Sequence, residues 1–216
     1  MRYPICDVYN IAALNPPLPS TVIQEQIVEG VHVYSLGTGT SMSPESFRFY
    51  KMLFVKQGKL RITIKDENGI PHIQELQKND GMITPKNKVI LVESIEDCVY
   101  LEILLGQTVN HTIKKPGEVF STPEVGLFEK GKLHTTRIIT SGFVEVTILC
   151  LDECVAKRIH KTNTMVFGYE GEGKVEVDGK TFLFGPGSSM RFTPEMKVTI
   201  TPLQGKMKLG VTNFFI

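Results

Sequence analysis

The residues with the clearest chemical potential lie in the segment "RIHKTNT", residues 158–164. If this segment is an extended strand, alternate side chains share one face, and that face carries Arg158, His160, Thr162 and Thr164. A guanidinium binds a carboxylate or a phosphate through two parallel hydrogen bonds, and an imidazole and hydroxyls add further hydrogen bonds. The pattern favours a site for a small polar or anionic molecule. Alternation does not decide which face points inward, so an exposed strand face without a ligand is the alternative.

The other histidines and the cysteines do not form a recognisable metal motif. No two of the five histidines are one or four residues apart: His32, His72, His111, His134 and His160. The four cysteines are scattered in apolar surroundings, which predicts free thiols rather than a disulfide framework: Cys6, Cys98, Cys150 and Cys154. Cys150 and Cys154 lie on one face if their segment is regular, but two further ligands for a metal are missing.

The overall composition argues against two classes of partner. The chain has 216 residues, and its 24 Lys and Arg nearly balance its 23 Asp and Glu. This balance gives no electrostatic reason to expect nucleic acid or an anionic membrane as a partner. No apolar run approaches the ~18 residues that cross a bilayer, and the start "MRYPICDVYN" lacks an apolar signal core. We therefore expect a soluble cytoplasmic protein that binds neither nucleic acid nor membrane.

An internal repeat predicts the elements that would position these residues. "MLFVKQGKLRITI" begins at Met52 and "MVFGYEGEGKVEV" begins at Met165, an offset of 165 − 52 = 113 residues. Further along, "MITPKNKVIL" is matched by "RFTPEMKVTI", with the Thr-Pro pairs offset by 193 − 84 = 109 residues. The two offsets differ by four residues, so one copy has a gap between the two phrases.

The gap falls where the chain turns. Between the phrases, the first copy reads "KDENGIPHIQEL" and the second reads only "DGKTFLF". Both contain Asn-Gly or Asp-Gly, the residues that tight hairpins require. Each copy therefore reads as strand, hairpin and strand, and the first copy should have the longer hairpin. This position of the gap favours an internal duplication.

The remaining patterns predict an all-β chain. Segments such as "GKLRITI" and "GFVEVTILCL" are rich in Val, Ile and Thr, and Gly and Pro interrupt them at short intervals. "STVIQEQIVEG" is compatible with a short helix or with an edge strand. Residues 106–124 have the composition of a linker between two similar units.

The second copy resembles the central strands of the cupin family. "MVFGYEGEGKVEVDGKTFLFGPGSSMRFTPEMKVTI" has the family's apolar strand, Gly-x-Gly turn, "DG" hairpin, Gly-rich turn and Pro-containing strand. Through the repeat, the whole chain is similar to a bicupin. The resemblance implies two tandem double-stranded β-helix (jelly-roll) barrels, covering residues 1–110 and 111–216.

The resemblance also implies where a metal would lie, and most of its ligands are missing. Anchored on Gly171 and Pro194, the ligand positions of the second barrel are Arg158, His160, Thr164 and Thr199. In the first barrel they are Glu45, Phe47, Lys51 and Ile90. One imidazole in the second barrel does not hold a divalent ion well. We therefore expect no bound metal and no other cofactor.

Two functions follow from the resemblance, with a ligand-free structural role as a third. The first is metal-independent binding of a sugar or carboxylate in the second barrel, with the first barrel mainly structural; the candidate ligand-binding residues are Arg158, His160, Thr164, Thr199 and Tyr169. The second is a metal-free enzyme similar to the family's dTDP-sugar epimerases, which use a His base with a carboxylate partner and a Tyr acid. His160 and Tyr169 would fill those roles here, with Glu145 or Asp152 as the carboxylate.

We also expect a homodimer. Unpaired sheet edges invite pairing with a second chain, and strands such as "YKMLF" and "TMVFG" offer apolar contact surface.

Overall fold

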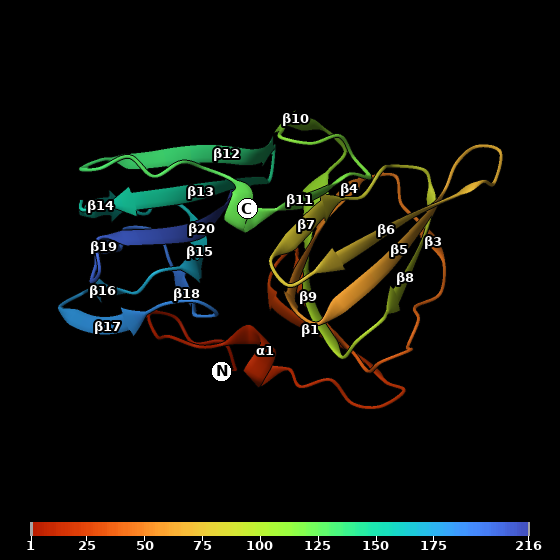
Figure 1. Ribbon diagram of the computed structural model, residues 1–216, viewed down its shortest axis with the longest axis horizontal. Helices are drawn as coiled ribbons and strands as arrows, with labels where there is room; N and C mark the ends of the chain where they lie inside the picture. The colour runs from red at the N-terminus through yellow and green to blue at the C-terminus, as the bar shows by residue number, and fades with distance from the viewer. Residues whose placement is uncertain (1, 216) are drawn as a thin grey trace. The chain divides into compact units, whose positions relative to one another are not determined.

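The computed structural model describes residues 2–215, which form two compact units of β-sheet (Figure 1). The N-terminal unit is residues Ala12–Ser121. The C-terminal unit begins at Thr122 and also includes the first segment of the chain, which ends at Ile11. The expected division at residues 110 and 111 thus lies eleven residues before the observed one.

The N-terminal unit consists of two sheets. The larger has the order β1-β2-β9-β4-β7-β11, with strands Val22–Val28, Val31–Leu36, Cys98–Gly106, Tyr50–Gln57, Asp80–Ile83 and Val119–Ser121. The smaller has the order β3-β8-β5-β6, with strands Glu45–Ser46, Val89–Ser94, Lys59–Lys65 and Pro71–Gln77. A short strand β10 (Val109–Thr112) and the one-turn helix α1 (Ile11–Leu14) complete the elements up to Ser121.

The C-terminal unit repeats this arrangement. Its larger sheet contains, in order, β12 (Leu133–Ser141), β13 (Val144–Asp152), β20 (Lys206–Phe214), β15 (Asn163–Glu170) and β18 (Ser189–Phe192). Its smaller sheet contains β14 (Ala156–Ile159), β19 (Lys197–Pro202), β16 (Gly173–Val177) and β17 (Lys180–Phe184), and a 3₁₀ turn η1 (Thr122–Glu124) opens the unit. The strands from β2 to β9 correspond one to one with those from β13 to β20.

Each unit has its core between its two sheets. Strand alternation produces this: β5 and β16 bury every second residue, as the patterns "KLRITIK" and "GKVEV" predict. In the C-terminal unit, the core contains Val166 and Leu209 from the larger sheet and Val175 and Val198 from the smaller. The N-terminal core is built in the same way and includes Leu53, Ile62 and the fully buried Tyr100.

The hairpins differ in length as predicted. In the first, the last pair of β5 and β6 is Lys65 with Pro71, whereas β16 and β17 close directly from Val177 to Lys180. The two tip residues of the short hairpin, Asp178 and Gly179, both have positive φ, as a two-residue turn requires.

The strand register corrects the alignment of the two Thr-Pro phrases. Met52 lies opposite Ile83, whereas Met165 lies opposite Arg191, so these strands are offset by 191 − 83 = 108 residues rather than 109. Asn87 and Glu195, the positive-φ residues of the two following loops, have the same offset, 195 − 87 = 108. Pro194 is therefore one residue beyond the place that corresponds to Pro85.

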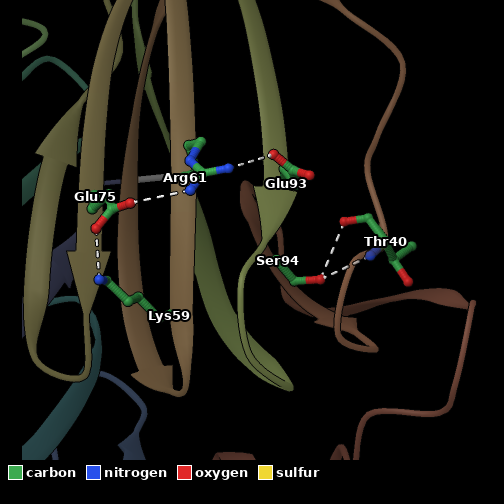
Figure 2. Close-up of polar contacts among 6 residues, drawn as sticks. All are labelled: Thr40, Lys59, Arg61, Glu75, Glu93 and Ser94. Atoms are coloured by element: carbon green, nitrogen blue, oxygen red, sulfur yellow. Dashed lines mark hydrogen bonds and ion pairs between the residues drawn. The ribbon is translucent and has the colours of Figure 1, made fainter.

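Charged pairs fix the register on the outer face of the smaller N-terminal sheet (Figure 2). Arg61 of β5 lies between Glu75 of β6 and Glu93 of β8, with a nitrogen 3.4 Å from a carboxylate oxygen of each. Lys59 adds a 2.6 Å ion pair with Glu75. Ser94 Oγ accepts a hydrogen bond from the Thr40 N–H and donates one to its carbonyl, which attaches the loop before β3 to β8.

Several segments differ from the sequence-based expectation or resolve an ambiguity. "VIQEQIV" is the edge strand β1 and not a helix. The predicted linker contains β11, which pairs with β7. In the C-terminal unit the matching place beside β18 is taken by the start of the chain, where Ile5 and Tyr9 form bridges to Arg191 and Ser189.

The cysteines and helices of the described residues need only brief notice. All four cysteines are free thiols, with Cys98 and Cys150 buried and the other two half-buried. Cys150 lies in β13, whereas Cys154 follows that strand in a loop, so the two do not share a regular face. Within residues 2–215 no helix has the length and apolar character needed to cross a membrane.

Candidate functional site

Arg158 and His160 line one pocket of the C-terminal unit, which we call the C-terminal pocket. It has a volume of about 260 Å³ and is also lined by Lys161, Asn213 and Phe215. The volume far exceeds the roughly 15 Å³ that one water needs, so the pocket has room for a small metabolite.

Strand β14 determines how these side chains point. Ala156, at the start of the strand, is part of the core, and alternation places Arg158 and His160 on the same face. Lys157 and Ile159, on the other face, are exposed. Across the strands, Arg158 pairs with Val198, another core residue. Arg158 is half-buried, and among the described residues no hydrogen-bond acceptor contacts its guanidinium.

His160 is held from three directions. Its ring stacks on Phe192, with the ring centres 4.8 Å apart and the planes 9° from parallel. Its backbone N–H donates to the Met196 carbonyl, and its carbonyl accepts from the Glu195 N–H. Its Nδ1 lies 3.0 Å from the Thr164 hydroxyl. The side chain is only 7% exposed, so its orientation is well defined.

A chain of polar groups leads away from His160 across the larger sheet. The Thr164 hydroxyl is 3.0 Å from Asn213 Oδ1, and Asn213 Nδ2 is 3.5 Å from a Glu145 oxygen. The other Glu145 oxygen accepts a 2.9 Å hydrogen bond from Arg137 Nε. Within the described residues no carboxylate bonds His160 directly. Glu145 is connected through two groups, and Asp152 pairs with Lys206 instead.

Burial and charge both favour a neutral His160. Desolvation lowers the pKa of His160, and the nearby positive charge of Arg158 lowers it further. Burial also lowers the pKa of Arg158, which the charge of Glu145 opposes. The pocket therefore presents one guanidinium cation beside an uncharged imidazole.

Two of the five predicted site residues lie elsewhere. Val198 and Ile200 face the core, so Thr199 between them points to the outer face, where it lines a separate hollow with Glu176 and Lys197. The physical reason is the one-residue register difference: Val198, not Thr199, occupies the inward position. Thr164 does lie beside His160, as predicted.

Tyr169 also lies away from the pocket. It is the extra residue of a β-bulge between Gly168 and Glu170, and its ring packs against Gly210. Gly210 lies between the core residues Leu209 and Val211, so Tyr169 is on the outer face of the larger sheet. Its side chain hydrogen-bonds Thr122, and burial raises its pKa.

A smaller cavity in the N-terminal unit, the N-terminal cavity, was not predicted. It has a volume of about 30 Å³, and Glu45, Phe47, Lys51 and Ile90, the four family positions, all line it. Lys51 forms a 2.8 Å ion pair with Glu102, and its ammonium lies 3.4 Å from the centre of the Phe47 ring. The sequence signal for Glu102 was weak, because a Glu at the centre of the apolar strand "CVYLEILLG" reads equally well as an exposed residue.

Neither place has side chains suited to a metal. Arg158 cannot ligate a metal and adds positive charge, and hydroxyl groups such as that of Thr164 are poor ligands for transition-metal ions. In the N-terminal cavity, Lys51 already occupies Glu102. Across residues 2–215 no three His, Cys, Asp or Glu side chains gather where they could hold an ion. No chemical step is therefore derived through a metal.

The fold defines the class of barrel. Two facing antiparallel sheets with this strand order, occurring in both units, are the jelly-roll architecture of cupin barrels. A cupin 2 conserved barrel domain protein from Leptotrichia buccalis matches with a TM-score of 0.84 and 16% identity, over 98% of this chain and 97% of that chain.

More distant similarity leads to an enzyme. Oxalate decarboxylase from Bacillus subtilis matches with a TM-score of 0.60 and 11% identity, over 95% of this chain and 75% of that chain. A further structure of that enzyme, with a TM-score of 0.59, is described in terms of its Mn(II) centres. No family model and no curated protein matches this sequence. At these identities the similarity shows the cupin fold and not the chemistry.

Proposed function

We propose that this protein is a tandem two-barrel cupin, produced by internal duplication, that binds a small anionic or polar metabolite without a metal. The duplication is supported by the matched strand orders of the two units and by two matched glycines. Gly58 and Gly171 both have positive φ, and each approaches the carbonyl of the residue before the last strand of its barrel, Asp97 and Lys206. The ligand is a carboxylate or an acidic sugar, and it occupies the C-terminal pocket.

The observation that carries this proposal is the state of Arg158. Its guanidinium is half-buried, lines the pocket and faces an apolar neighbour across the strands. A desolvated cation without a protein partner gains most from an anion that supplies one. In the N-terminal cavity, by contrast, Glu102 already neutralises Lys51. We therefore assign binding to the C-terminal barrel and a mainly structural role to the N-terminal one.

The alternative is a metal-free isomerase or epimerase. Such an enzyme needs a His base, an orienting carboxylate and a Tyr acid at one site. Tyr169 is on the outer face of the sheet, and Glu145 reaches His160 only through Thr164 and Asn213. These positions favour binding over that particular catalysis.

A metabolite screen by thermal shift tests the proposal directly. A ligand that binds only the folded state raises the unfolding midpoint. Small carboxylates, sugar acids and sugar phosphates should raise it, and neutral sugars of equal size should raise it less. No shift with any acid would favour a structural role without a ligand. Elemental analysis should find no stoichiometric iron, manganese, nickel or zinc, and a metal lost on His160→Gln would overturn metal independence.

We also propose a cytoplasmic homodimer that does not engage nucleic acid or membranes. The strands "YKMLF" and "TMVFG" belong to β4 and β15, which are paired on both sides and offer no free edge. The outermost strands β1, β6 and β17 offer one instead. Light scattering should give twice the mass of the chain, and a monomer at high concentration would contradict this.

A further inference from the structure

The Thr164 hydroxyl has one proton and three polar neighbours. Its oxygen is 3.0 Å from His160 Nδ1, 3.0 Å from Asn213 Oδ1 and 3.2 Å from the Thr162 carbonyl. Two of these neighbours are oxygens that only accept. A close contact between two oxygens requires a hydrogen between them, and only the Thr164 hydroxyl can supply it.

Glu145 fixes the orientation of the Asn213 amide. Its carboxylate oxygens act only as acceptors, one from Arg137 and the other from Asn213 Nδ2. Because Nδ2 points to Glu145, Oδ1 points to Thr164. The Thr164 proton is therefore directed to a carbonyl oxygen, whether that of Asn213 or that of Thr162, and is not available to His160.

The imidazole must then donate. With the Thr164 proton used elsewhere, the 3.0 Å contact to His160 requires a proton on Nδ1. A neutral imidazole carries one N–H, so its Nε2 keeps a lone pair. Among the described residues no donor contacts Nε2, and the His160 ring lines the C-terminal pocket.

We infer that Thr164, Asn213 and Glu145 are positioning residues that hold His160 as the Nδ1–H tautomer, so that the pocket selects an acid carrying a hydroxyl group. The second half of this inference rests on the proposed function. Arg158 supplies donors for the acidic group, and Nε2 of His160 accepts from the hydroxyl. The two residues are two positions apart on one face, about 7 Å along the strand, so the two ligand groups lie close together. Hydroxycarboxylic acids and sugar acids have this chemistry.

Nitrogen NMR of the imidazole rings tests the tautomer without any ligand. In ¹⁵N-labelled protein at pH 8, the His160 signals are identified by their loss in His160→Gln. We expect a protonated Nδ1 and an unprotonated Nε2. Thr164→Val removes the acceptor and should shift the population toward Nε2–H, whereas Thr164→Ser should keep Nδ1–H. An Nε2–H tautomer in the wild-type protein would overturn the inference, whether or not the variants fold.

A matched pair of acids tests the ligand class. Lactate and propionate differ by one hydroxyl, and titration followed through the His160 signals should show lactate binding roughly tenfold tighter or better. Equal binding of the two acids would overturn the hydroxyl requirement while leaving the proposed anion site standing. Binding of neither acid, with Nδ1–H observed, would count against the proposed function and the ligand class but support the tautomer.

Discussion

Arg158 of β14 lies directly opposite Val198 of β19, so the cation at the C-terminal pocket has an apolar neighbour across the strands. The next residue, Thr199, lies opposite Lys157 on the outer face. An apolar cross-strand partner cannot neutralise a guanidinium. The charge is therefore available to a ligand at little cost to the rest of the barrel.

Replacing Arg158 should abolish anion binding without unfolding the protein. We expect Arg158→Met to weaken binding of a small acid at least about tenfold, because a charged hydrogen bond contributes roughly 1.5–3 kcal/mol. Stability should change by less than about 1 kcal/mol, since the removed charge was partly desolvated. Calorimetric titration and urea unfolding measure the two effects. Lys157→Met, an exposed change on the opposite face of the same strand, is the control, and equal loss of binding in both would contradict the assignment.

The Lys51–Glu102 ion pair should behave as a buried pair. Removing either partner leaves an uncompensated charge, so Lys51→Met or Glu102→Leu should each cost about 3 kcal/mol of unfolding free energy. The double variant should recover most of that loss, because two apolar side chains need no partner. A double-mutant cycle by denaturant unfolding measures the coupling. Additive losses in the double variant would mean that the pair is effectively solvated.

Gly58 and Gly171 should be equally intolerant of a side chain. Both have positive φ, and a Cβ at either would collide with a backbone carbonyl. Alanine there combines conformational strain of roughly 1–3 kcal/mol with a steric clash. Gly69 and Gly179 also have positive φ but open surroundings, so Gly69→Ala and Gly179→Ala measure the strain alone. Thermal unfolding should rank Gly58→Ala and Gly171→Ala clearly below these controls.

Features that depend on local pattern could be predicted from the sequence. Alternation of apolar residues gives the strands, and Asp-Gly gives the short hairpin, because turn geometry depends on only a few neighbouring residues. The placement of Arg158 and His160 beside one pocket also follows from alternation in a single strand.

Features that depend on pairing between distant segments could not. Thr199 was placed in the site because the Thr-Pro phrases match, yet a positive-φ residue in the following loop shifts the strand by one position and reverses every side chain. Tyr169 was misplaced by a bulge, which alternation does not reveal. Asn213 comes from a strand 49 residues beyond Thr164, and its contact depends on the sheet order.

His160 should make stability dependent on pH in a defined direction. An unfolded histidine has a pKa near ~6.5, and burial together with the Arg158 charge lowers the folded value below that. Between the two values the unfolded state binds more protons, so the unfolding free energy rises with pH in this interval and is constant above it.

The expected result is therefore a loss of stability on acidification that depends on this one ring. Wild-type protein should lose more stability than His160→Gln between pH 7 and pH 5, measured by urea unfolding, because only the wild type must keep a desolvated imidazole uncharged. The difference between the two proteins cancels the carboxylates that both share, Glu145 included. Arg158→Met provides a second check: without the neighbouring cation the folded pKa rises, so the pH-dependent loss should shrink. A difference between wild type and His160→Gln that is flat, or that grows as the pH rises, would show that the imidazole is charged or solvated in the folded protein.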